Sequence, residues 1–256
     1  MAKNSMESPR SPGQDLGEFE LIQSIFQSSA DAMAKTHPQG APILGIGDDC
    51  AIVAASDMDD LAVTSDMLIA GRHFFADADP YLLGRKSLAV NLSDLAAMGA
   101  KPTGFTLALA LPEAQQNWLQ SFAKGLFDIA KVFNCRLIGG DTCKGPLAIS
   151  ITAFGKIPRG QSILRSGAKV GDGIWVSNMV GDARLALAAI QNEWPLNLSA
   201  AEQSMINVRL HSPTPRIELG IALRGIASAA LDISDGLLGD LKHILEESGV
   251  NAEVNM

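Results

Sequence analysis

Aspartate-containing motifs recur along this chain beside apolar runs, and their order limits the possible folds more than any other feature. The apolar runs are typical of strands, and they alternate with amphipathic stretches that are typical of helices. The motifs contain Asp48 and Asp49, Asp66, Asp94, Asp141, and Asp232 with Asp235. Strands and helices that alternate in this way predict a mixed α/β (α+β) fold. We expect the acidic motifs to meet at one place in that fold.

The composition is typical of a soluble globular protein and excludes some functions. Hydrophobic residues make up 47% of the 256 residues and charged residues 19%, whereas disordered chains combine low hydrophobicity with high net charge. The formal net charge of -8 argues against a broad nucleic-acid surface, because such a surface requires clustered Lys and Arg. Every apolar run is shorter than the roughly 20 residues that span a bilayer. We therefore expect no nucleic-acid partner, no membrane and a cytoplasmic location.

The chain is long enough for two domains of ordinary size. Residues 1–16 are rich in Ser, Pro and charge, and they predict a disordered tail. Gly, Ser, Arg and Lys punctuate residues 158–173, which favours a domain boundary near Gly160. These signals divide the chain into an N-terminal domain, residues 17–160, and a C-terminal domain, residues 161–256.

Periodicity and turn residues place the elements. Helices are predicted over residues 17–34, 80–98, 113–133, 182–191, 200–210 and 216–227, and in a last helix that ends before Gly249. Strands are predicted over residues 43–53, 61–66, 104–111 and 147–153, and in the segments 174–176 and 229–233. In this arrangement the motifs at Asp66 and Asp232 lie where a strand ends or a helix begins.

The helix predicted over residues 80–98 has two distinct faces. Its apolar face holds Leu88, Leu92 and Leu95. Its polar face holds Ser87, Asn91 and Asp94. Residues three and four apart share a helix face, so Asp94 and Asn91 would lie on one polar stripe. That stripe suits the wall of a metal pocket, and it equally suits a solvated helix face.

Glycines accompany the acidic motifs. Gly45 and Gly47 before Asp48 and Asp49 let the backbone approach a ligand closely, so that one carboxylate can ligate a metal while the other pins the loop. The alternative is an acidic turn with an Asx cap. The run Gly139-Gly140-Asp141-Thr142 repeats the pattern, with backbone N–H groups free for phosphate oxygens.

Two further motifs supply oxygen ligands. Thr64-Ser65-Asp66 combines hydroxyl and carboxylate oxygens at a predicted strand end, and Asp232-Ile233-Ser234-Asp235-Gly236 precedes a helix, where Ser or Asp also serves as an N-cap. Mg²⁺ prefers oxygen ligands, and the three cysteines form no Cys-x-x-Cys pair that would suggest zinc. Repetition of the motif favours Mg²⁺-dependent phosphoryl transfer.

Nucleotide binding would have to differ from that of the common ATPases. The chain has neither a Gly-x-x-x-x-Gly-Lys-Ser/Thr loop nor the protein-kinase motifs, so cations would hold most of the phosphate charge. Arg165 and Lys169 are the basic residues placed nearest the triphosphate, although linker cations are often only solvated. His73 is a candidate contact for a substrate phosphate or ring. A general base is not needed when a phosphate oxygen is the nucleophile.

The motifs together closely resemble the thiamine-phosphate kinase family, and the resemblance covers residues 17–256. It is carried by the segments 45–49, 64–66, 71–74, 89–100, 139–142, 165–168 and 232–237. The most specific of these is Asn91-Leu92-Ser93-Asp94-Leu95-Ala96-Ala97-Met98-Gly99-Ala100. The wider superfamily includes aminoimidazole ribonucleotide synthetase, selenophosphate synthetase and a hydrogenase-maturation protein.

The resemblance implies a two-domain subunit whose N-terminal domain forms a β-barrel-like homodimer core with ATP near the interface. It implies transfer of the γ-phosphoryl group of ATP to thiamine phosphate, giving thiamine diphosphate and ADP. Asp66 and Asp141 would be catalytic, and His73 would contact thiamine phosphate. ATP would be contacted by Gly140, Arg165 and Ser234. The Mg²⁺ ligands would be Asp49, Thr64, Ser65, Asp66, Asp94, Asp141, Asp232 and Asp235.

The sequence departs from the family pattern at one place, and two alternative functions stay open. Members of the family continue beyond the last helix through a Gly-Gly-Glu-Asp-Tyr-like segment, so the C-terminal α/β domain is expected to be incomplete and the chain to bind thiamine phosphate poorly or to be inactive. One alternative is another ATP-using enzyme of the superfamily. Residues 1–15 lack the reactive Cys or selenocysteine with a nearby Lys of a selenophosphate synthetase. The other alternative is a non-catalytic nucleotide-binding or metal-binding dimer module.

Overall fold

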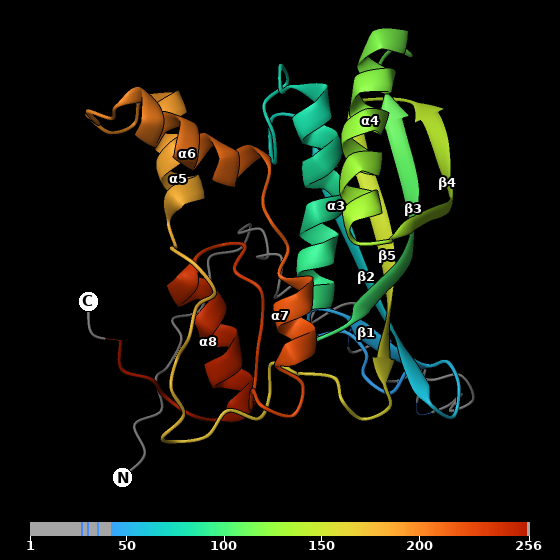
Figure 1. Ribbon diagram of the computed structural model, residues 1–256, viewed down its shortest axis with the longest axis vertical. Helices are drawn as coiled ribbons and strands as arrows, with labels where there is room; N and C mark the ends of the chain where they lie inside the picture. The colour runs from blue at the N-terminus through green and yellow to red at the C-terminus, as the bar shows by residue number, and fades with distance from the viewer. Residues whose placement is uncertain (1–26, 28–29, 31–34, 36–41, 255–256) are drawn as a thin grey trace, which may run out of the picture.

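The computed structural model describes residues 27, 30, 35 and 42–254. In this part of the chain it has a mixed α/β fold with one five-stranded sheet and six helices (Figure 1). The predicted tail and most of the predicted helix over residues 17–34 lie outside the described residues. Among the described residues, no helix has the length and apolar character needed to cross a membrane.

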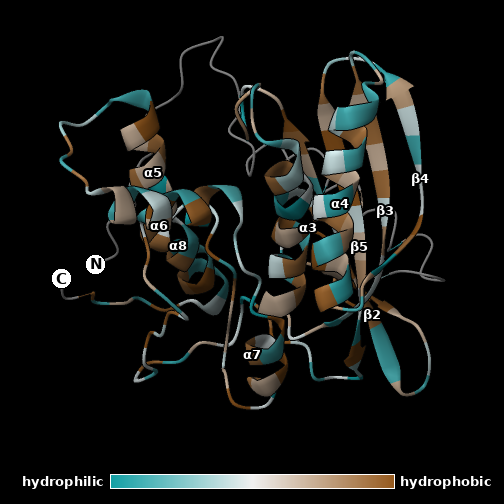
Figure 2. Cartoon of the chain, turned by 45° about the horizontal axis from the view of Figure 1, so that its top comes forward, coloured by the Kyte–Doolittle hydropathy of each residue, from teal (hydrophilic) through white to brown (hydrophobic). Residues whose placement is uncertain are grey.

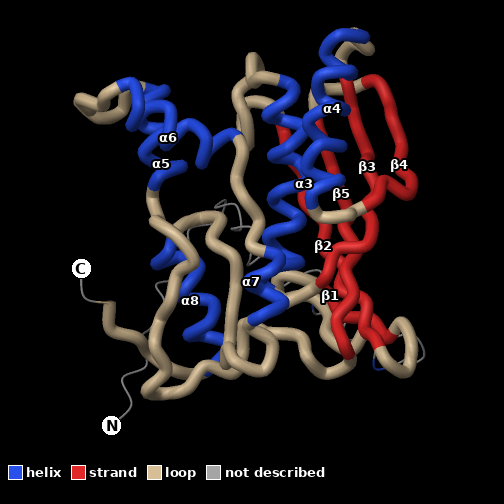
Figure 3. The backbone as a smooth tube through the Cα atoms, viewed as in Figure 1, coloured by secondary structure: helices blue, strands red, loops and turns tan. Residues whose placement is uncertain are grey.

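The sheet has the strand order β1-β2-β5-β3-β4 (Figure 3). Its strands are β1 (Ala51–Ala54), β2 (Asp59–Ile69), β3 (Lys101–Leu111), β4 (Arg136–Lys144) and β5 (Ala148–Pro158). All neighbouring strands are antiparallel except β3 and β4, which are parallel. Side chains along β5 alternate between buried and half-buried, because successive residues of a strand point to opposite faces. The sheet therefore has one face in the core and one face that is open.

Helices α3 (Pro80–Ala97) and α4 (Gln116–Val132) cover the core face. Asp79 caps α3 by accepting a hydrogen bond from the Leu82 amide at 2.9 Å, and Pro80 occupies the first turn, where its missing N–H costs nothing. The predicted apolar face of α3 is confirmed, since Leu88, Leu92 and Leu95 are fully buried. In Figure 2 α4 carries both hydrophilic and hydrophobic patches, as expected of a helix with one buried face.

Two glycines let α3 and α4 touch backbone to backbone. A Cβ atom on Gly84 would lie 2.1 Å from the Phe122 carbonyl oxygen, and one on Gly125 would lie 1.9 Å from the Tyr81 carbonyl oxygen. Side chains never approach so closely to a backbone, so glycine is required at both positions. The contact fixes how α3 lies on the sheet.

The remaining helices follow β5. They are α5 (Asp182–Gln191), α6 (Ala200–His211), α7 (Ile217–Ala222) and α8 (Leu237–Ser248). Helices α5 and α6 pack together, and α7 packs on α3, where a Cβ on Gly220 would lie 1.9 Å from the Ala96 carbonyl oxygen. Figure 1 shows α7 and α8 on the side of α3 that faces away from the sheet. The open face of the sheet is left with exposed Met67 and Ile69.

Several predicted elements are wrong. Residues 174–176 and 229–233 contain no strand, and Trp175 is 91% exposed. Both segments have the composition of a strand, but a strand also needs a neighbour with which to pair, and none is present among the described residues. Helix α7 is shorter than the predicted range 216–227. The motifs 64–66 and 139–142 lie inside β2 and β4 and not at strand ends, because pairing with β5 and β3 continues past them.

Candidate metal and phosphate site

Three carboxylates from distant segments converge beside the end of α3. Asp49 lies in the loop before β1, Asp94 lies in the last turn of α3, and Asp232 lies in the loop before α8. One oxygen from each lies within 4.8 Å of the others. The predicted meeting of these motifs is therefore confirmed for Asp49, Asp94 and Asp232.

Burial makes this cluster electrostatically costly. It raises the pKa of Asp49 to about 7, and burial together with the nearby charges of Asp232 and Asp66 raises the pKa of Asp94 to about 9. Burial also raises the pKa of Asp232. Desolvation and like charges both disfavour the ionised form, so at neutral pH the cluster requires bound protons or a cation.

The donor set fits a hard divalent cation. Asp49 Oδ2 is buried without a hydrogen-bond partner among the described residues, and such an oxygen gains most from a ligand. Oxygens from three carboxylates, with the Thr64 hydroxyl beside them, match the preference of Mg²⁺. Asp49, Asp94 and Asp232 are thus the residues that could hold a metal.

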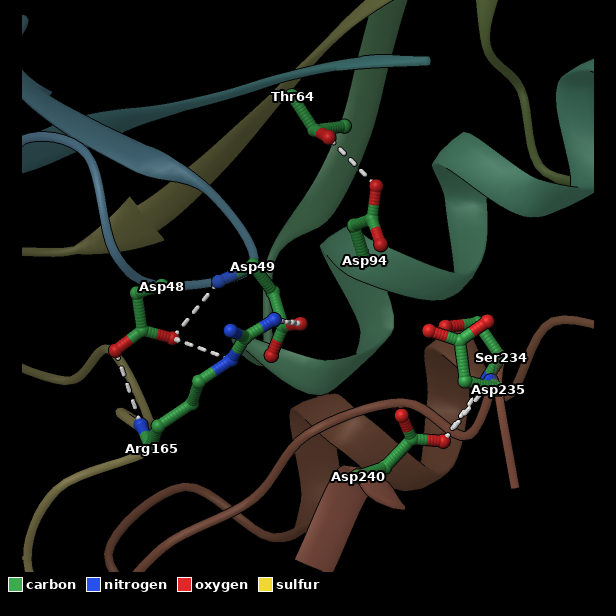
Figure 4. A network of polar contacts seen from close by, with 8 residues as sticks. All are labelled: Asp48, Asp49, Thr64, Asp94, Arg165, Ser234, Asp235 and Asp240. Carbon is green, nitrogen blue, oxygen red and sulfur yellow. Dashed lines mark hydrogen bonds and ion pairs between the residues drawn. The ribbon is translucent and has the colours of Figure 1, made fainter. Parts of the chain in front are cut away.

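The polar stripe of α3 is not a solvated face, since Ser87 and Asn91 are buried and Asp94 is half-buried. The Thr64 hydroxyl donates to Asp94 Oδ2 at 2.6 Å (Figure 4). Asn91 is 1% exposed; its Oδ1 accepts a hydrogen bond from the Asp66 amide at 3.2 Å, and its Nδ2 donates to the Ser87 carbonyl at 3.2 Å. These bonds tie β2 to α3 and hold Asp94 in one orientation.

Arg165 is the basic residue of the site. Its Nη2 donates to Asp49 Oδ1 at 2.6 Å, and its backbone amide donates to Asp48 Oδ2 at 3.0 Å (Figure 4). Asp48 Oδ1 also accepts from the Asp49 amide at 2.9 Å. The predicted pinning role in the acidic pair therefore belongs to Asp48. Lys169 is exposed on its loop, and within the described part of the chain no hydrogen bond or ion pair links its side chain to the cluster.

Helix α8 supplies two contacts that sequence reasoning missed. Asp240 Oδ2 accepts hydrogen bonds from the amides of Ser234, Asp235 and Gly236. Ser248 Oγ accepts from the amides of Gly167 and Ala168, both at 3.1 Å. The alternative role of Ser234 or Asp235 as an N-cap is not realised, since Gly236 is the N-cap of α8. Asp240, inside the helix, binds the free amides instead. The only sequence signal was an acidic residue four positions after Gly236.

Some predicted residues do not join the cluster within one chain. Asp141 is exposed on β4 opposite Ala108, and β5 and β3 separate β4 from β2, a distance of about 14 Å at the usual strand spacing. Ser65 faces the open side, with its Oγ 3.0 Å from Thr152 Oγ1. His73 is exposed in the turn after β2, where its Nδ1 accepts from the Ile69 amide at 3.0 Å. Ser234 and Asp235 have exposed side chains on the loop before α8.

Gly140 has a structural reason to be glycine. Its φ is +149°, and a Cβ would lie 1.9 Å from the Leu107 carbonyl oxygen. Close packing of β4 on β3 accounts for this residue without a phosphate, so its predicted contact with ATP stays a prediction.

The fold and the site together define the class of protein. Residues 47–157 match the family model described as AIR synthase related protein, N-terminal domain. This range contains the sheet, α3, α4, and Asp49 and Asp94 of the cluster.

Individual relatives narrow the class. Thiamine-monophosphate kinase of Salmonella typhimurium is 45% identical over 240 residues, which cover 94% of this chain and 72% of the relative. The crystal structure of thiamine-monophosphate kinase from Stenotrophomonas maltophilia K279a aligns with a TM-score of 0.73 at 45% identity, covering 91% of this chain and 73% of that one. A structure of AaThiL complexed with AMPPCP and TMP aligns with a TM-score of 0.78 at 31% identity, covering 93% and 74%. The chain belongs to the thiamine-monophosphate kinase family.

Proposed function

We propose that this chain phosphorylates thiamine phosphate with ATP, giving thiamine diphosphate and ADP. The observation that carries the proposal is the convergence of the largely desolvated carboxylates of Asp49, Asp94 and Asp232 in a member of this family. The solved complex of AaThiL with AMPPCP and TMP, to which the chain is similar, supports both substrates. A buried acidic cluster of this kind has little structural value by itself, because it costs free energy unless a cation is bound.

The predicted metal ligands divide into two groups by their place in the fold. Asp49, Asp94 and Asp232 form the cluster, and Thr64 and Asp66 are tied to it through Asp94 and Asn91. Ser65, Asp141 and Asp235 lie on exposed surface and would join only with substrate or a second subunit present. Mg²⁺ held by the cluster residues would supply positive charge that offsets the negative charge of the phosphates.

The residues of the chain then act mainly by position and charge. A terminal oxygen of thiamine phosphate attacks the γ-phosphorus of ATP, the bond to the β-phosphate oxygen breaks, and ADP leaves. Arg165 is proposed to contact phosphate oxygens of ATP, and its position beside Asp49 supports this. No general base is assigned, because a phosphate nucleophile is already ionised at neutral pH. His73 is proposed to contact thiamine phosphate, and Ser234 to contact ATP.

A direct assay tests the proposal. The chain is incubated with ATP, Mg²⁺ and thiamine phosphate, and thiamine diphosphate is separated by chromatography. We expect product to depend on Mg²⁺, and Asp94→Asn to lower the rate at least a hundredfold while the fold is retained. Binding of AMPPCP without any product would contradict the kinase proposal and favour a binding module.

We also propose a homodimer in which Asp141 serves the cluster of the other subunit. The separation of β4 from β2 supports this, because Asp141 cannot reach Asp94 in its own subunit without unpairing the sheet. Gly140 and Asp141 lie on exposed β4, where a second copy has access to them.

Mixed dimers test the arrangement. Asp94→Asn and Asp141→Asn subunits are each expected to be inactive. In a mixed dimer, sharing across subunits leaves one site with both wild-type residues, so activity should return to about half of the wild-type value per dimer. If Asp141 acts in its own subunit, both sites of the mixed dimer carry a substitution and the mixture stays inactive.

A further inference from the structure

One carboxylate oxygen holds the loop that precedes α8. Asp240 Oδ2 accepts hydrogen bonds from the amides of Ser234 at 2.9 Å and Asp235 at 3.2 Å (Figure 4). The same oxygen accepts from the Gly236 amide at 3.0 Å. The Asp240 side chain belongs to the first turns of α8, and the residue is only 6% exposed. Three consecutive amides are thus fixed by one buried group.

These hydrogen bonds satisfy backbone amides at the start of α8 that would otherwise lack a partner. The amides before and within the first turn of a helix have no carbonyl partner of their own. Gly236 has no capping side chain and a φ of +127°, which only glycine adopts easily. A carboxylate at a helix N-terminus is favoured by the helix dipole and forms strong hydrogen bonds because it is charged. Asp240 therefore determines the path of residues 234–236.

The path of this loop matters for the metal cluster. Asp232 lies two residues before Ser234, and its carboxylate is drawn into a group with Asp49 and Asp94 in which all three repel one another. A loop without an anchor would relax by moving Asp232 towards solvent, where a free carboxylate is more stable. Asp240 opposes that relaxation from the side of α8.

The other end of α8 anchors the second loop of the site. Ser248 Oγ accepts from the amides of Gly167 and Ala168 and donates to the Arg165 carbonyl at 3.3 Å. The loops that carry Asp232 and Arg165 are therefore attached to the same helix.

We propose that Asp240 is a positioning residue that holds Asp232 in the metal-binding arrangement through the amides of residues 234–236. The proposal rests on the proposed function insofar as Asp232 is taken as a metal ligand. Loss of a group that orients a metal ligand typically lowers metal affinity or activity 10–100-fold.

The experiment uses Asp240→Asn, Asp240→Ala and a matched control, Asp60→Asn. Asp60 is likewise a buried aspartate, 3% exposed, and it accepts a hydrogen bond from the Gly160 amide at 3.3 Å, but it lies near the start of β2, away from the cluster. Amide hydrogen exchange by NMR reports on residues 234–236, and Mn²⁺ titration followed by electron paramagnetic resonance reports on the metal site. Thermal unfolding checks that each variant is folded.

We expect both Asp240 variants to exchange the three amides at least tenfold faster than the wild type and to bind Mn²⁺ about tenfold more weakly. Asp60→Asn should behave like the wild type in both measurements. Wild-type exchange at these amides and Mn²⁺ affinity within twofold of the wild type in a folded variant would overturn the proposal. If Asp240→Ala does not fold, Asp240→Asn decides by the same two measurements. A wild-type chain that binds Mn²⁺ but forms no thiamine diphosphate contradicts the kinase proposal alone.

Discussion

At the scale of single residues, the clustered carboxylates of the site lower the stability of the folded state when they are ionised. Asp49 and Asp94 have pKa values raised by burial to about 7 and about 9, far from the value of 3.8 expected in the unfolded chain. Arg165 offsets part of the charge at Asp49, but Asp94 faces Asp232, Asp66 and Asp49 with only a hydroxyl donor. The cost should be visible in how stability depends on pH.

Without metal, the stability of the chain should fall as pH rises. The folded state binds more protons than the unfolded state between the unfolded pKa of 3.8 and the folded values of about 7 and about 9. Stability linked to these groups is therefore fully present at acidic pH and is lost as pH rises through this window. Thermal unfolding in chelator across that range should show it. Asp94→Asn has no titrating carboxyl at position 94, so it should lose less stability than the wild type over this pH range. Parallel curves of stability against pH for the two proteins would contradict the assignment.

At the scale of the elements, α3 is the part of the molecule that the sequence predicted best. Its period, its Pro80 start and its apolar and polar faces are all confirmed, because local chemistry decides them. The strands predicted at residues 174–176 and 229–233 were wrong, because a strand needs a pairing partner and composition does not reveal one. Asp240 was missed for a similar reason, since an acidic residue in a helix ordinarily faces water. Its role depends on a loop that folds back over the helix start.

The contact between α3 and α4 gives an element-scale prediction. Gly125→Ala should destabilise the protein by about 1–3 kcal/mol or more, because the new methyl group collides with the Tyr81 backbone and forces the helices apart. Gly239→Ala is the matched control, a helical glycine in α8 with no atom within 4 Å of the added Cβ. It should stabilise the protein by about 0.5–1 kcal/mol. Urea unfolding measures both, and equal effects would show that the close contact does not exist.

At the scale of the whole molecule, the described helices cover only one side of the sheet. Met67 is 56% exposed and Ile69 is 41% exposed on the open face, and the whole of β4 is exposed. A long exposed strand edge and apolar side chains of this kind usually mark a surface that another chain covers. The predicted homodimer would use this face, which would also bring β4 to a second subunit.

Charge on the open face should prevent the dimer. Met67→Asp places a carboxylate on the open face that the proposed interface would cover, so we expect a monomer in light scattering coupled to size-exclusion chromatography. Met58→Asp is the control and should remain a dimer. Met58 is 78% exposed and lies in the turn between β1 and β2, outside the residues through which these two strands pair. A Met67→Asp protein that keeps the mass of a dimer would exclude this face as the interface.

Two of the glycine contacts of α3, those of Gly84 and Gly220, limit how the chain can vary. Gly84 fixes the helix near its start against α4, and Ala96 meets Gly220 of α7 near its end, so the rotation of α3 about its axis is set at both ends. Insertion of one residue between these contacts would turn everything after it by about 100°, directing Asp94 away from Thr64. The number of residues between Gly84 and Ala96 is therefore constrained. Related chains should tolerate insertions in their loops while keeping this number unchanged.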